Sequence, residues 1–286
     1  MFDHLSPEAR AVATESADYR KLYCQKEIWV PHTGASAAIE RLTEYARHPK
    51  SHRMPVGLIS GPTGTGRRTV MERLVALHPE QVKMVTLPET FQERRIAISM
   101  LKALRHPSPW RCDVWRLIEI TTTALRNSDV RIVCIYNADD IGFAGRGAQG
   151  RYLALLRRFK EQGKVSLIFR GGEQARKLLR LDPELREQAE QFSLRPWGVE
   201  RSTAIAIARA VREFPLRLPT LIDEAFLQAV FESSAGVPGR IFAQLRNAAW
   251  NAIDRKIEHI SPELLRSSAV RPRLGRPTDG ASDNDR

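Results

Sequence analysis

Residues 59–70 read ISGPTGTGRRTV, in which two glycines have the spacing of a phosphate-binding loop. In the pattern G-x-x-x-x-G-K-[S/T], backbone amides surround the phosphates, the lysine reaches the outer phosphates and the hydroxyl holds Mg²⁺. Here Gly61 and Gly66 keep the glycine places, whereas Arg67 replaces the lysine and Arg68 replaces the hydroxyl residue. The stretch therefore indicates phosphate binding with altered charge and without the usual metal ligand.

Arginine at the lysine place changes what the loop can bind. Its planar fork of donors suits phosphate oxygens, and it has no atom that could ligate a cation. We expect Arg67 to hold a phosphate in altered geometry, and Thr69 to supply a hydroxyl only if the loop slips by one residue. An ordinary tight turn from strand to helix would need the same glycines, so that alternative stays open. The candidate nucleotide-binding residues of the loop are Gly61, Pro62, Thr63, Gly64, Thr65, Gly66, Arg67, Arg68 and Thr69.

A second motif distinguishes P-loop enzymes that hydrolyse nucleotides. In these enzymes a later apolar strand supplies an Asp that orients Mg²⁺, together with a residue that activates the attacking water, often a Glu beside it. The corresponding strand here ends in Tyr136 and Asn137, neither of which is a carboxylate. Asp139 and Asp140 follow, and they would serve only if their loop folded back; a solvated loop is the simpler interpretation. The sequence is thus compatible with ATP or ADP as ligand, and it argues against Mg²⁺, any metal site and a catalytic residue at this strand.

Composition and charge narrow the class of protein. Of the 286 residues 42% are hydrophobic, and the formal net charge is +12, which favours a polyanionic partner such as nucleic acid over a merely solubilising charge. No apolar run approaches the roughly 20 residues that span a bilayer, and the start of the chain lacks a signal peptide, so we expect a cytoplasmic protein without membrane contact. The widely spaced Cys24, Cys112 and Cys134 are expected to be reduced thiols.

The order of apolar segments predicts an α/β core. Strands are expected at 56–60, 82–88, 131–136 and 165–170, and helices at 34–47, 67–78, 91–105, 113–127, 151–163 and 173–181. Parallel strands need crossover connections, so this alternation predicts a parallel sheet with helices on both faces.

The pattern changes after Arg195-Pro196-Trp197, where only helical periodicity continues. We therefore expect a polar N-terminal arm at 1–27, an α/β core at 28–195, a helical lid at 196–266 and a disordered tail at 267–286, which is rich in Pro, Gly, Asp and Arg.

Several stretches, taken in order, resemble the TniB proteins, AAA+ ATPases of a group of bacterial transposons that are related to TnsC. The resemblance is carried by residues 27–66, 130–145, 165–185, 192–197 and 214–253. The first and last of these stretches are its most specific parts. It implies an α/β fold with an AAA+ P-loop core, a parallel sheet and a small all-helical lid domain.

The resemblance also implies partners. Family members bind ATP, assemble on DNA as helical or ring-like oligomers, and link a TniQ-type target selector to a DDE transposase. The implied partners are double-stranded DNA, the transposase, the target selector and further copies of the chain, alone or mixed with a normal TniB. Our first interpretation is a transposition accessory protein with weak or absent ATP hydrolysis. The alternatives are an active ATPase that uses Arg67, Thr69 and Asp139 or Asp140, and an interaction module that binds no nucleotide.

Some single residues acquire roles through the resemblance. Gly61, Gly64 and Gly66 match the loop glycines of the family, and Ile28 with Trp29 match a segment that lies near the adenine. The departures from the family pattern fall at Arg67, Arg68, Tyr136 and Asn137, the places of the lysine, the hydroxyl and the two carboxylates.

Further positions concern neighbouring subunits and DNA. Phe169-Arg170-Gly171 replaces a small polar sensor, and Gln188 stands at the place of a trans-acting arginine, with Arg186 close by. Arg240 opens a lid helix at a plausible place for a sensor arginine. The pairs Arg94-Arg95 and Arg157-Arg158 are expected on polar helix faces. The simpler interpretation is that these charges are only solvated, and the more specific one is that they contact DNA.

Overall fold

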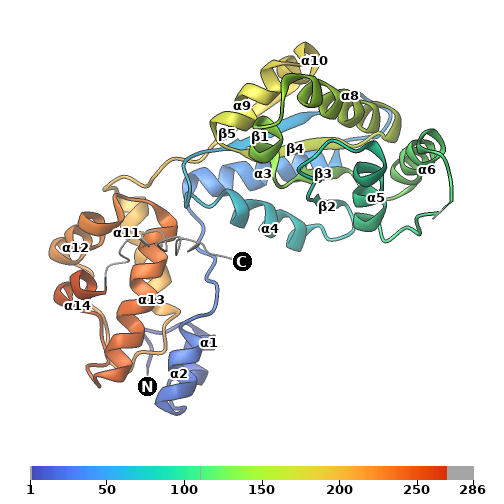
Figure 1. Cartoon of the computed structure of the whole chain (residues 1–286). Coiled ribbons are helices and arrows are strands. Elements are labelled where there is room, and N and C mark those ends of the chain that lie inside the picture. Colours follow the sequence, from blue (N-terminus) through green and yellow to red (C-terminus); the bar gives the residue numbers. More distant parts are fainter. Residues whose placement is uncertain (1, 110, 269–286) are drawn as a thin grey trace, which may run out of the picture. The chain divides into compact units, whose positions relative to one another are not determined.

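The computed structural model describes residues 2–109 and 111–268, and these divide into two compact units. The first, which we call the sheet unit, comprises residues 29–206 and 237–239. The second, the helical unit, comprises residues 2–28, 207–236 and 240–268. Figure 1 labels the elements of both units.

The sheet unit is built on five parallel strands in the order β2-β3-β4-β1-β5. Their bounds are β1 Val56–Ser60, β2 Val82–Val85, β3 Ile132–Ile135, β4 Ser166–Gly171 and β5 Ala189–Ser193. The predicted parallel sheet is confirmed, and its four expected strands are present. The fifth strand, β5, was not predicted from the sequence, because an edge strand with only Phe192 buried has no continuous apolar run.

Helices cover both faces of this sheet (Figure 1). They are α3 Thr33–Arg47, α4 Arg67–Leu77, α5 Glu93–Ala103, α6 Val114–Asn127, α7 Ala138–Gly142, α8 Arg146–Gly163, α9 Glu173–Arg180 and α10 Pro183–Gln188. Alternate residues of β3 enter different cores: Val133 and Ile135 pack in the cluster that includes α5, α6 and α8, and Cys134 packs in the cluster of α3 and α4. Because side chains alternate between the two faces of a strand, β3 is packed on both faces, and this packing fixes the position of its carboxyl end in the sheet.

The helical unit contains α1 Pro7–Val12, α2 Ala17–Tyr23, α12 Glu224–Ser234 and α14 Pro262–Ser267, together with most of α13 Pro238–Asp254 and the second half of α11 Arg201–Arg212. The boundary expected at residue 196 instead falls inside α11, between Ala206 and Ile207. The predicted tail lies largely outside the described residues, which end at 268.

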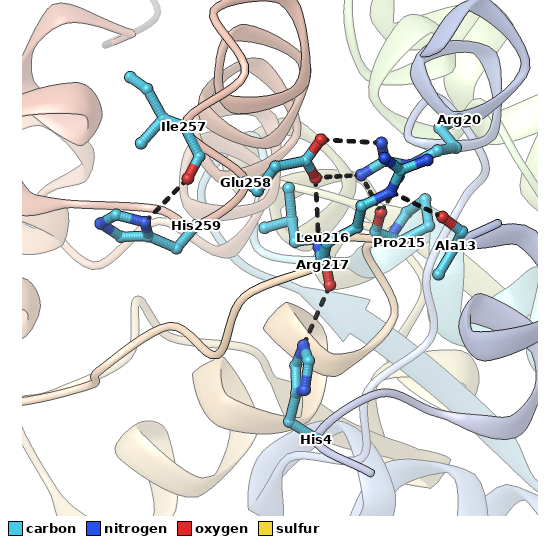
Figure 2. A network of polar contacts seen from close by, with 9 residues as sticks. All are labelled: His4, Ala13, Arg20, Pro215, Leu216, Arg217, Ile257, Glu258 and His259. Atoms are coloured by element: carbon cyan, nitrogen blue, oxygen red, sulfur yellow. Dashed lines mark hydrogen bonds and ion pairs between the residues drawn. The ribbon is translucent and has the colours of Figure 1, made fainter. Parts of the chain in front are cut away.

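Residues 1–27, expected to form an arm, fold as α1 and α2 and belong to the helical unit. Figure 2 shows the anchor, the guanidinium of Arg20, which is 1% exposed. Its Nε donates to the carbonyl of Pro215 at 2.9 Å, and its Nη1 donates to Glu258 Oε1 at 2.9 Å. Arg217 Nε adds a bond to the carbonyl of Ala13 at 3.1 Å. The segment was misassigned because its buried apolar residues, Leu5, Ala9 and Ala13, are few and mostly small, and because its polar anchor is a single arginine.

None of the helices in the described part of the chain is long and apolar enough to cross a membrane.

Candidate nucleotide-binding site

The glycine loop lies between β1 and α4, at the carboxyl edge of the sheet. A Cβ built on Gly61 would lie 2.2 Å from the carbonyl oxygen of Leu194, so this position excludes any side chain. Gly66 has φ 93° and caps α4, a left-handed conformation that favours glycine. Backbone amides and the amino end of an 11-residue helix therefore meet at this loop, as phosphate binding requires.

A cavity of about 490 Å³ opens beside the loop, within the size range of small-ligand sites. It is lined by Gly61, Pro62, Thr63, Arg67, Asp139, Phe143, Gly172, Glu173, Gln174 and Arg176. Four of the predicted loop residues thus face a common space with residues of α7 and α9. Thr65, in contrast, is buried and donates its hydroxyl to the carbonyl of Pro62 at 2.8 Å, so it serves the loop itself.

The two arginines that replace the lysine and the hydroxyl residue of the P-loop pattern lie in different environments. The side chain of Arg67 is 13% exposed, and its Nη1 lies 3.5 Å from Asp139 Oδ2. The side chain of Arg68 is 61% exposed, and its Nε donates to Glu72 Oε1 at 2.6 Å along α4. Thr69 is exposed in the first turn of α4, which starts at Arg67 without a slip of the loop. Arg67 alone of these three side chains lines the cavity, among the residues described.

Asp139 does not lie in a solvated loop, because α7 turns it back toward the glycine loop. Its carboxylate accepts hydrogen bonds from the amides of Gly172 at 2.7 Å and Ala175 at 3.0 Å. It therefore caps the amino end of α9, where a negative charge is favourable. The expectation of a solvated loop was wrong for Asp139, whose carboxylate reaches the cavity but is already engaged. Asp140 is exposed.

The positions of the missing carboxylates have structural roles. The Asn137 side chain accepts from the amide of Leu87 at 2.9 Å and donates to its carbonyl at 2.9 Å, which ties the end of β3 to the segment after β2. The ring of Tyr136 stacks on Arg170, with the guanidinium carbon 3.9 Å from the ring centroid. Arg170 Nε also donates to the Tyr136 carbonyl at 2.7 Å. Neither position offers a carboxylate to a metal or a water molecule.

Arg176 of α9 was missed by sequence reasoning. It lines the cavity, its Nη1 pairs with Glu173 Oε2 at 3.0 Å, and its Nη2 lies 3.5 Å from Ser60 Oγ at the end of β1. Its Nε is buried and makes no hydrogen bond within the described part of the chain. From the sequence the residue looks like half of a surface pair with Glu173, and no spacing signal connects it to the loop.

Trp29, Ile28 and Arg240 are not among the described residues that line this cavity. Trp29 is half-buried, with its ring centroid 6.0 Å from the Arg73 guanidinium carbon on α4. Ile28 and Arg240 belong to the helical unit, where Arg240 is exposed on α13, so their proposed roles stay predictions.

Some of the residues considered for contacts between subunits or with DNA already have partners within the chain. Gln188 accepts from the buried ammonium of Lys160 at 2.6 Å, and burial lowers the pKa of Lys160. Arg157 pairs with Asp182 at 3.3 Å, whereas Arg186 is exposed at the end of α10.

The donor set fits phosphate better than a metal ion. Loop amides, Arg67 and Arg176 offer positive groups to phosphate oxygens. Mg²⁺ requires oxygen ligands, yet Asp139 faces two amide donors and an arginine. In residues 2–109 and 111–268, no group of three or more His, Cys, Asp or Glu side chains could hold a metal ion.

The fold is shared with solved nucleotide-binding and DNA-associated proteins. The ORC2 protein of Aeropyrum pernix, solved in ADPNP–ADP complexes, is 17% identical and superposes with a TM-score of 0.64 over 86% of this chain and 70% of that one. Cdc6p of Pyrobaculum aerophilum is also 17% identical, with a TM-score of 0.61 over 86% and 69%. Drosophila ORC bound to DNA is 14% identical, with a TM-score of 0.60 over 90% and 66%.

These likenesses confirm the expected α/β AAA+ P-loop fold and carry no statement about ligands of this chain. A search of curated protein sequences found no match. The profile of the family described as "Bacterial TniB protein" matches residues 20–199, more than half of the chain and including β1, the glycine loop, β3 and β4. The chain belongs to the TniB family.

Proposed function

We propose that this protein is a transposition accessory protein of the AAA+ class that assembles on double-stranded DNA and connects a TniQ-type target selector with a DDE transposase. In this proposal ATP or ADP is a structural ligand of the assembly, and hydrolysis is weak or absent.

The observation that carries the proposed lack of hydrolysis is that Tyr136 and Asn137, neither of them a carboxylate, stand at the end of β3. Asn137 is committed to the backbone of Leu87, and Tyr136 stacks on Arg170. Asp139, the nearest carboxylate along the chain that reaches the cavity, caps α9. Hydrolysis needs a group that activates or orients the attacking water, and these contacts leave none of the three residues free for that task.

Support for DNA as partner comes from charge and fold. The formal net charge of +12 favours a polyanion. The fold is shared with an ORC assembly solved on DNA, and the resemblance to the TniB family implies assembly of copies on DNA. An oligomer of this chain on DNA is part of the same proposal, and the family membership supports it.

One observation favours a second candidate, an interaction module without nucleotide. Arg67 already contacts Asp139 across the cavity, so the loop's main positive group has an internal partner. In that case the fold would serve only as a platform for the selector or the transposase.

The test combines duplex binding with phosphate release on the full chain. We expect fluorescence anisotropy to show binding to a labelled duplex that weakens as salt rises, because each neutralised phosphate releases counterions. Phosphate release from ATP should stay at the level of a protein-free control, with and without DNA. An active ATPase would instead release phosphate, and Asp139→Asn would abolish the release. Absence of duplex binding at low salt would contradict the proposal.

A further inference from the structure

On the basis of the nucleotide binding proposed above, we propose that Arg67 and Arg176 bind the phosphates without a divalent cation. When a phosphate binds, it replaces Asp139 as the partner of the Arg67 guanidinium. The ligand class is a di- or triphosphate chain, and the pair of guanidiniums supplies the positive charge that Mg²⁺ and lysine supply in ordinary P-loops.

Arg176 has unused hydrogen-bonding capacity beside the loop. A guanidinium has five donors, and this one has a buried Nε without a partner in the described structure and a long 3.5 Å contact to Ser60. Buried donors without acceptors are rare enough to need an explanation. The side chain is 33% exposed and pairs otherwise with Glu173, whose side chain is 54% exposed. Turning Arg176 toward a phosphate therefore breaks only a weak contact and a solvent-exposed pair.

Arg67 is equally easy to release. Charge-assisted bonds between guanidinium and carboxylate are normally about 2.7–2.9 Å long, whereas the Arg67–Asp139 contact is 3.5 Å and formed by one nitrogen. When Arg67 leaves, the Asp139 carboxylate still accepts from the amides of Gly172 and Ala175. The exchange thus leaves no buried charge without a partner, the situation that makes most ion pairs hard to break.

The same contacts oppose a metal ion at Asp139. A cation at this carboxylate would face the amide donors of α9 and the guanidinium of Arg67, all of which carry positive charge toward it. Arg68, at the place of the hydroxyl residue, pairs with Glu72 outside the cavity and has no atom that could ligate a metal ion. Around Asp139 the cavity therefore favours anionic oxygens over Mg²⁺, and Glu173, the other carboxylate among the described lining residues, pairs with Arg176.

Calorimetry on the full chain tests this assignment, with ATP and sodium tripolyphosphate as the probes. We expect each probe to bind at least as tightly in EDTA as in Mg²⁺ buffer, because Mg²⁺ chelates the phosphate oxygens of both probes in solution and competes with the two guanidiniums for them. Arg67→Ala and Arg176→Ala should each weaken binding roughly tenfold to hundredfold, the effect of losing a hydrogen bond between charged groups. Arg176→Lys should recover part of the loss. Arg180→Ala, an exposed arginine of α9 that is not among the described cavity residues, is the matched control and should bind as the parent does.

A variant that is expected to bind more tightly complements the alanine variants, because misfolding could explain weaker binding but not tighter binding. Asp139→Asn keeps an oxygen for the α9 amides and removes the charge that holds Arg67, so tripolyphosphate should bind several-fold more tightly. A loss of more than tenfold in EDTA, no detectable binding of either probe, or equal affinities for Arg176→Ala and Arg180→Ala would overturn the proposal. If duplex binding persists in those cases, the accessory function stands, whereas loss of duplex binding alone would contradict that function and leave the calorimetric result unaffected.

Discussion

Two arginine–carboxylate contacts, one in each unit, use the same chemical groups in opposite ways. In the helical unit the guanidinium of Arg20 is 1% exposed and bonds both oxygens of Glu258 as well as the carbonyl of Pro215. In the sheet unit Arg67 makes one 3.5 Å contact with Asp139, whose side chain is 33% exposed. The first pair is bidentate and satisfied, and the second is long and shared with backbone amides.

The other partners of the carboxylate decide the role of each pair. When Arg20 is removed, the partly buried Glu258 carboxylate keeps only the Arg217 amide of these two donors. Asp139 keeps two amide donors whatever Arg67 does. The first pair therefore fixes α2 to the rest of the helical unit, whereas the second can exchange its arginine with a ligand.

The largest effect is expected from Arg20→Ala. Removing one partner of a buried pair typically costs about 3–5 kcal/mol, because the other charge stays buried. Urea denaturation followed by circular dichroism should show this loss in the free energy of unfolding. Arg10→Ala, which removes a pair whose side chains are 45% and 86% exposed, is the control and should cost less than about 1 kcal/mol. Equal effects of the two substitutions would mean that residues 1–27 are held by other contacts.

A smaller effect is expected from Asn137→Asp, which restores a carboxylate next to the end of β3. The new oxygen would face the Leu87 carbonyl that now accepts a hydrogen bond, and we expect a loss of about 1–3 kcal/mol in stability. Phosphate release from ATP should stay at background, because Tyr136 and Asp139 are unchanged. Asn247→Asp, an exposed position on α13, controls for the added charge. ATPase activity gained by Asn137→Asp alone would show that one carboxylate is enough.

Acid should weaken the first pair through Glu258. Burial by itself raises the pKa of this carboxyl, but hydrogen bonds from Arg20 and from the Arg217 amide lower it below the ordinary 4.5. A lowered folded-state pKa means that the stabilisation is complete above about pH 4.5 and is lost as pH falls below it. Between pH 6 and pH 3 the unfolding free energy of Glu258→Gln should therefore fall less steeply than that of the parent. The unfolding free energy of both proteins is measured by urea denaturation at each pH. An equal fall with pH in the parent and in Glu258→Gln would contradict the role assigned to Glu258.

The sequence predicted the centre of the sheet because β1, β3 and β4 are short apolar runs next to turn signals. It missed β5, whose polar residues need no buried face at the sheet edge, and it took residues 1–27 for an arm. The anchor of that segment joins Arg20 to a carbonyl 195 residues away, and no local periodicity encodes such a contact. The loop glycines and Arg67 were found from spacing, but Arg176 reaches the loop only because β4 and α9 fold beside β1.

The smallest effect on stability is expected from Arg67→Ala. Because Asp139 keeps its bonds to Gly172 and Ala175 and the Arg67 contact is a single long one, the unliganded protein should lose only about 1 kcal/mol, the net contribution of one hydrogen bond. Urea denaturation of the unliganded chain measures this directly, with Arg68→Ala as the neighbouring control for loss of an arginine on α4. A loss comparable with that of Arg20→Ala would mean that Arg67 is a structural anchor of the loop. The contact with Asp139 would then be too costly to exchange, and phosphate could not take its place.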